Sequence, residues 1–121
     1  MLAVIAGAMV LTGCIKKDAA TINVKVVNKL TMPQANVQVY MYSGNISDEL
    51  LKNKVNATTN IATDENGVAT FEINSLSFGV ASDQATFIFE TFDEDGNVTG
   101  KVPTTVKKGG SKDVTLSMNV F

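Results

Sequence analysis

The stretch ATFIFETFDEDGNV, residues 85–98, is the part of the chain that most directly indicates a fold. Residues 85–92 are mostly β-branched and aromatic, the types that favour strands. Their middle is apolar on both faces, as expected of a strand inside a sheet. The pair Asp95-Gly96 then precedes a further strand-like run, and Asp-Gly between two such runs is a strong hairpin signal. The stretch therefore predicts a central strand, a tight turn and an antiparallel partner.

Alternation of apolar and polar residues recurs along the rest of the chain and predicts short strands. Further strands are expected at residues 21–28, 36–42, 58–63, 68–74, 98–102 and 113–120. Between them, Asp64-Glu65-Asn66-Gly67 has the residue pattern of a type I turn. Residues 47–54 (SDELLKNK) are a helical candidate, although eight residues make only a marginal helix. The pattern predicts an all-β fold, a single antiparallel β-sandwich of about seven strands.

Three segments carry a likeness to a known family. They are Val26-Val27-Asn28, residues 32–39 (MPQANVQV) and residues 63–71 (TDENGVATF). Together they resemble the transthyretin-like, or carboxypeptidase-regulatory-like, family over about residues 21–92. Lys29-Leu30-Thr31 stands where that family usually has a turn glycine. The resemblance implies an Ig-like or transthyretin-like sandwich with an accessory, adhesive, or protein- or carbohydrate-binding role, and it implies no particular site residue.

The beginning of the chain is apolar and uncharged. Residues 1–13 (MLAVIAGAMVLTG) are too short to span a hydrocarbon core, which takes ~20 helical residues, but they have the length of a signal-peptide core. Their last three residues and the next one form Leu11-Thr12-Gly13-Cys14, which resembles the lipobox of bacterial lipoproteins and contains the chain's only cysteine. The resemblance implies a signal peptide at 1–13, lipidated Cys14 and a tether at 14–20, and a sandwich domain at 21–121.

Two features of this region leave alternatives open. A signal peptide ordinarily begins with basic residues, and none stands before Leu2. The alternative is a buried helix with an inert Cys14. Lys16-Lys17-Asp18 is weakly similar to a surface-export signal of some Bacteroidetes lipoproteins, and its alternative is a solvated linker. Two or more acyl chains hold a protein stably on a membrane, so we expect a lipid-anchored protein of the cell envelope, at the outer membrane.

The residue inventory excludes several kinds of chemistry. The chain has no histidine, arginine or tryptophan. Serine–histidine and cysteine–histidine mechanisms and imidazole zinc sites are therefore excluded. A net charge of −2 with scattered lysines argues against nucleic acid as a partner. We expect no cofactor beyond the lipid on Cys14 and no enzymatic activity, but a membrane-anchored binding or accessory lipoprotein. The alternatives are a structural or adhesive subunit of a surface assembly and a small carboxylate-based hydrolase.

One acidic turn is a weak candidate for calcium. Asp93, Asp95 and Asn97 reproduce the D-x-D-x-N start of a calcium loop, in which oxygens at alternate positions converge on the ion. The glycine and glutamate expected later in such a loop are replaced by Val98 and Thr104. The sequence therefore favours the alternative, an ordinary hairpin turn.

Aromatic and acidic residues on strand faces are the remaining candidates. Tyr40 and Tyr42 lie on one face of a predicted strand, where they can stack on a sugar or anchor a protein partner. The alternative is that both pack under the Ser43–Asn56 loop or against a second sheet. Glu72 and Glu90 would be the carboxylates of a hydrolase if they faced one cleft, and the alternative is that both are exposed charges on a sheet surface.

Overall fold

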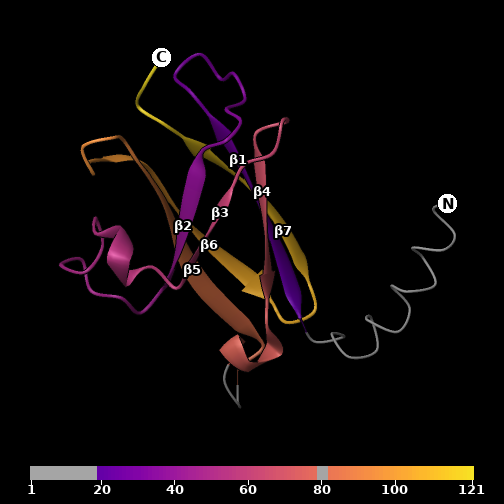
Figure 1. Ribbon diagram of the computed structural model, residues 1–121. Coiled ribbons are helices and arrows are strands. Elements are labelled where there is room, and N and C mark those ends of the chain that lie inside the picture. Colours follow the sequence, from indigo (N-terminus) through magenta and orange to yellow (C-terminus); the bar gives the residue numbers. More distant parts are fainter. Residues whose placement is uncertain (1–18, 79–81) are drawn as a thin grey trace, which may run out of the picture.

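Seven strands form two sheets in the computed structural model, which describes residues 19–78 and 82–121 (Figure 1). They are β1 Ala20–Val27, β2 Gln38–Ser43, β3 Thr59–Ala62, β4 Val68–Ile73, β5 Gln84–Phe92, β6 Val98–Lys107 and β7 Ser111–Ser117. The predicted all-β sandwich is confirmed. Cys14, the expected signal peptide and most of the tether lie outside the described residues.

The sheets have the strand orders β4-β1-β7 and β3-β2-β5-β6. Every neighbouring pair is antiparallel except β1 and β7, which run parallel. The stretch that is apolar on both faces becomes β5, which lies inside the four-stranded sheet between β2 and β6. The predicted strand at 98–102 continues to Lys107 as β6. Pro103 is tolerated within it because β6 is an edge strand, where a missing N–H costs little.

The hydrophobic core lies between the two sheets. Alternate residues of β1 point inward, and Ile22, Val24 and Val26 are fully buried. The rings of Phe71 on β4 and Phe89 on β5 meet across the core with their centroids 5.0 Å apart. Residues with the opposite parity on β2 and β5 therefore point away from the core, and they form the outer face of the four-stranded sheet.

Two turns are built alike, as their sequences predict. In each, an aspartate carboxylate accepts backbone N–H groups: Asp64 Oδ1 from Asn66 and Val68, and Asp93 Oδ1 from Asp95 and Asn97. The glycine that closes each turn has a positive φ, +80° at Gly67 and +84° at Gly96. Each carboxylate thus satisfies two donors that the tight turn leaves without a strand partner.

The prediction of a helix at residues 47–54 is wrong. Within this segment Leu50 and Leu51 N–H donate to Ser47 O, which makes one helical turn, and Lys52 follows at φ +71°. A short 3-10 helix, η1 (Lys54–Asn56), comes next, and a second, η2 (Ser75–Phe78), follows β4. We call residues 44–58 the covering loop. In the described part of the chain no helix is long and apolar enough to cross a membrane.

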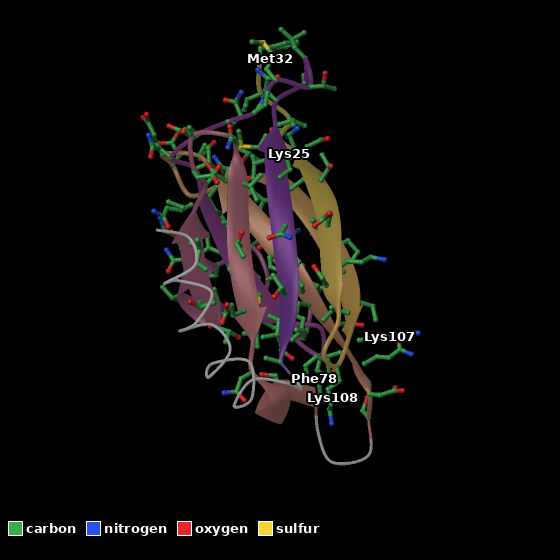
Figure 2. The ribbon with its side chains drawn as sticks, turned by 90° about the vertical axis from the view of Figure 1, so that its right-hand side faces the viewer. Lys25, Met32, Phe78, Lys107 and Lys108 are labelled. Carbon is green, nitrogen blue, oxygen red and sulfur yellow. The ribbon has the colours of Figure 1, made fainter. Side chains whose placement is uncertain are left out.

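The sandwich has two distinct ends. β1 begins beside the β6–β7 turn, where Thr21 N–H donates to Gly110 O at 3.0 Å. Lys107 and Lys108 mark this end in Figure 2, and Met32 marks the other. At the far end, residues 28–37, the 93–97 turn and the C-terminal residues gather (Figure 1). The eight residues of β1, at ~3.3 Å each, separate the two ends by about 26 Å.

Candidate functional site: a groove at the far end of the sandwich

A groove of about 690 Å³ lies at the far end, where β2 begins and β5 and β7 end. Its volume is within the range of ligand pockets, roughly 300–1,000 Å³. We call it the end groove. Its lining residues come from β2 and the two residues before it, η1, the end of β5, the 93–97 turn, the start of β6 and the C-terminal segment: Asn36, Val37, Gln38, Tyr40, Lys54, Phe92, Asp93, Glu94, Asp95, Thr99, Met118 and Val120.

Two aromatic rings form a corner in the end groove. Tyr40 on β2 lies opposite Glu90 on β5, so Phe92, two residues along β5, is its diagonal neighbour on the same outer face. The ring centroids are 5.4 Å apart and the ring planes meet at 84°. Both rings are partly exposed. The rings are thus in edge-to-face contact, and both line the end groove with part of their surface exposed.

The 93–97 turn supplies the carboxylates of the end groove. Asp93 is committed to the turn: Oδ1 accepts the N–H groups of Asp95 and Asn97, each at 2.9 Å. These hydrogen bonds, the one from Asn97 foremost, lower the pKa of Asp93 below its ordinary value. Glu94 and Asp95 are exposed on the groove rim. They, rather than Asp93, have carboxylates that the turn does not use as acceptors.

The calcium candidates Asp93, Asp95 and Asn97 thus share one turn. Within residues 19–78 and 82–121, no group of three or more acidic, histidine or cysteine side chains is placed to hold a metal ion. The Asn97 side-chain amide donates to Asp93 Oδ2 at 3.4 Å, a further bond inside the turn. The turn stays an untested weak candidate for calcium, and the observed hydrogen bonds are those of a capped hairpin.

The rim and floor of the end groove differ in character. On the rim, the amide of Gln38 is oriented by Asn60, whose Nδ2 donates to Gln38 Oε1 at 2.9 Å. Lys54 reaches the rim from η1. Met118 contributes to an apolar floor, while the buried hydroxyl of Thr99 is paired with that of Thr91 at 2.8 Å. The end groove therefore joins an apolar floor and aromatic wall to polar side chains with donors and acceptors.

Tyr42, the second tyrosine candidate, lies outside the end groove. It is 0% exposed and sits on the outer face of the sheet near Glu90, which is also 0% exposed. Glu90 Oε1 accepts the Lys52 N–H of the covering loop at 3.0 Å. Tyr42 Oη and Glu90 Oε2 have no hydrogen-bond partner among the described residues. Burial, and then the negative charge of Glu90, raise the pKa of Tyr42 above its ordinary value. The structure thus separates the two tyrosines: one lines the end groove and one is buried.

The carboxylate pair considered for a hydrolase does not share a cleft. Glu72 is exposed on β4, as expected, but the expectation that Glu90 is exposed is wrong, because the covering loop buries it. The core-facing residues beside them, Phe71 and Phe89, place both carboxylates on outer faces, and these faces belong to different sheets. Packed sheets are ~10 Å apart, so the whole sandwich separates the two side chains.

Sequence reasoning missed the burial of Glu90 and the role of Phe92. A glutamate inside the run ATFIFETF is a signal of the first, because both of its strand neighbours are apolar or β-branched. The second depends on strand register, which sets Phe92 next to Tyr40. Residues 40 and 92 are far apart in the chain, and only the pairing of β2 with β5 brings them together.

No protein-family model matches this chain, and no curated protein matches its sequence. Among solved structures, the major pilin subunit BcpA of Bacillus cereus is similar at 11% identity and a TM-score of 0.53. The match covers 85% of this chain and 30% of BcpA. The TIE protein of Bacillus anthracis matches at 12% identity and a TM-score of 0.50, over 83% of this chain and 17% of that one.

A 3-chlorocatechol 1,2-dioxygenase from Rhodococcus opacus has 14% identity and a TM-score of 0.49, over 86% of this chain and 60% of that one. This chain therefore spans less than two thirds of each of these proteins. At such identities the matches to BcpA and the TIE protein show a shared β-sandwich fold and nothing about activity.

Proposed function

We propose that this chain is a non-enzymatic subunit of the bacterial cell surface with a structural or adhesive role, held on the outer membrane by lipid on Cys14. The observation that carries the proposal is the position of the end groove, at the opposite end of the sandwich from the start of β1. A lipidated Cys14 would leave only residues 15–19 before β1. Five extended residues reach at most about 18 Å.

That short tether gives the molecule an orientation. The start of β1 and the Lys107 turn would lie next to the membrane. The end groove, about 26 Å further along β1, would face outward toward other molecules. A site that binds a partner in a surface assembly needs this placement, whereas a site facing the anchor would be shielded by the membrane.

One likeness supports the structural or adhesive role over a purely accessory one. BcpA, whose fold this chain shares, is a major pilin subunit. The segments that resemble the transthyretin-like family imply an accessory, adhesive or binding module rather than one that catalyses, and they do not choose among these three roles. The alternative role is that of a membrane-anchored binding or accessory lipoprotein of the cell envelope.

The role is tested with a photoreactive phenylalanine analogue at position 40, in the full chain expressed in its native cell. Illumination of intact cells should give covalent adducts at position 40, because the side chain at this position lines the end groove. The matched control is the same analogue at Lys107, at the opposite end. Adducts at neither position, or equally at both, would contradict a role that depends on the outward end.

The anchor is tested by intact-mass spectrometry of the chain isolated from its native membrane. The expected species begins at Cys14 and carries the added mass of two or three acyl chains. A Cys14→Ser variant should keep residues 1–13 and carry no acyl chains. A native species that retains residues 1–13, or has an unmodified Cys14, would rule out the lipid anchor.

A further inference from the structure

We propose that the end groove binds an uncharged sugar unit of a glycan, with Tyr40 and Phe92 as its stacking surface. This inference deepens the proposed adhesive role and rests on it for its biological setting. The binding chemistry itself depends only on the residues of the groove.

The ring corner suits a ligand that has an apolar face. A pyranose ring exposes C–H groups on its faces and hydroxyls around its edge. Tyr40 and Phe92 meet at 84°, so a sugar ring stacked on one of them is flanked by the other. Aromatic side chains provide a large contact area at a low entropy cost, and partly exposed ones commonly anchor ligands.

The polar rim distinguishes a sugar from charged ligands. Glu94 and Asp95 offer acceptors, Lys54 offers donors, and the Asn36 and Gln38 amides offer both. A hydroxyl donates one hydrogen bond and accepts others, so it can use both kinds of partner. An alkylammonium group can only donate hydrogen bonds, and its positive charge would be repelled by Lys54. A phosphate group binds through oxygens that accept hydrogen bonds, and its negative charge would be repelled by Glu94 and Asp95.

The floor and the size of the end groove agree with this class of ligand. Val37, Met118 and Val120 give an apolar floor beneath the rim. At about 690 Å³ the groove is large enough for more than one small ring, within the usual range of ligand pockets. It is also open at the end of the sandwich, where β2, β5 and β7 begin or end, so a chain of sugars can continue beyond it.

The groove is held in place before any ligand arrives. Tyr40 and Phe92 lie on neighbouring, hydrogen-bonded strands. Asp93 fixes the turn that carries Asp95 through two backbone hydrogen bonds, and Asn60 orients the amide of Gln38. A site whose side chains are already ordered loses less conformational entropy on binding than a mobile one.

The chain's own fluorescence can report binding. It contains two tyrosines and no tryptophan, so emission comes from Tyr40 in the groove and from buried Tyr42. The full chain is kept in a detergent without a sugar headgroup and titrated with hexasaccharides of glucose, mannose, xylose and N-acetylglucosamine. A saturable change in tyrosine emission with at least one of these neutral oligosaccharides is the expected result.

Three variants locate the binding. Phe92→Ala should weaken the sugar affinity at least tenfold, because it removes one wall of the corner. Tyr40→Phe, followed by calorimetry, should stay within about threefold of the wild type, because the stacking surface remains. Phe121→Ala removes an aromatic ring that is 81% exposed and outside the end groove, and it should leave the affinity unchanged.

Several outcomes would overturn the inference. They are no saturable binding of any of the four oligosaccharides, binding that Phe92→Ala leaves intact, and competition by lysine amide or inorganic phosphate. If photoreactive Tyr40 captures a protein on cells while no sugar binds, the inference fails and the proposed function stands. If sugars bind but the native chain is not lipidated at Cys14, the proposed anchoring fails and the inference stands.

Discussion

Glu90 and Tyr42 are side chains whose surroundings differ sharply from those expected of an outer sheet face. Both are fully buried there, and each has an oxygen without a hydrogen-bond partner among the described residues. A buried polar group left without a partner costs about 1–3 kcal/mol. The two groups lie close enough for the carboxylate of Glu90 to raise the pKa of Tyr42. This pair is therefore a site where small substitutions should change stability measurably.

Replacement of Tyr42 by phenylalanine should stabilise the fold. The change keeps the ring and removes a buried hydroxyl without a partner, so the free energy of unfolding should rise by about 1 kcal/mol at neutral pH. Urea denaturation followed by circular dichroism measures it. Tyr40→Phe is the control, with an expected change within about 0.5 kcal/mol. A marked loss of stability in Tyr42→Phe would show that the hydroxyl has a partner in solution.

The raised pKa of Tyr42 predicts a loss of stability at alkaline pH. An unfolded tyrosine ionises near pH 10, whereas folded Tyr42 holds its proton to higher pH. The ionisation of Tyr42 therefore leaves the free energy of unfolding unchanged below about pH 10. Above that pH the free energy of unfolding declines, because only the unfolded state then releases the proton. Chemical denaturation between pH 8 and 11 should show a steeper decline in the wild type and in Tyr40→Phe than in Tyr42→Phe. Equal slopes in all three would contradict this assignment.

Glu90 holds the covering loop through the Lys52 N–H, at a residue with a positive φ. Glu90→Gln keeps an oxygen acceptor for this bond, whereas Glu90→Leu removes it at similar volume. We expect hydrogen exchange at the Lys52 amide, measured by NMR, to be unchanged in the first variant and at least tenfold faster in the second. Equally slow exchange in both would mean that the loop is held by other contacts.

At the scale of the elements, the two aspartate-glycine turns allow a direct comparison of what a side chain costs at Gly67 and at Gly96. Both glycines have nearly the same positive φ, but their surroundings differ. A Cβ at Gly67 would lie 2.9 Å from Pro33 Cβ and 3.0 Å from Gln34 N, whereas a Cβ at Gly96 would have nothing within 4 Å. The conformational cost is therefore shared, and the steric cost belongs to Gly67 alone.

Alanine at each glycine should separate these two costs. Gly96→Ala should destabilise the fold by about 1–2 kcal/mol, the cost of a left-handed residue with a side chain. Gly67→Ala should cost at least about 1 kcal/mol more, because its Cβ meets the backbone next to Pro33. Thermal and urea unfolding of the two variants measure the difference. Equal losses would mean that the 32–34 segment moves aside freely.

Local signals explain why most elements could be predicted from the sequence. Alternation marked the strands, and Asp and Gly marked the turns, since both depend on neighbours within a few residues. The helix at 47–54 failed because its leucines pack differently: Leu51 is buried while Leu50 is exposed, and Lys52 leaves the helical path toward Glu90. That partner is distant in the sequence, so the local pattern carried no sign of it.

At the scale of the whole molecule, the end groove joins two candidates that the sequence treated separately. Tyr40 and the Asp93–Asp95 turn meet only because β2 pairs with β5 and the turn closes the end of β5. The sequence indicated the residue types but not their common site. The opposite end, with Lys107 and the start of β1, is where a lipid on Cys14 would hold the chain. The central claim is therefore an orientation: the end groove outward, the start of β1 toward the membrane.

Labelling of intact cells with a bulky, membrane-impermeant maleimide tests this orientation most directly. Glu94→Cys places a thiol on the groove rim and Lys107→Cys places one beside the start of β1, while a lipidated Cys14 has no free thiol. We expect rapid labelling of the Glu94→Cys chain, slow labelling of the Lys107→Cys chain and none of the wild type. Equal rates in the two variants, or labelling only after the cells are broken, would contradict it.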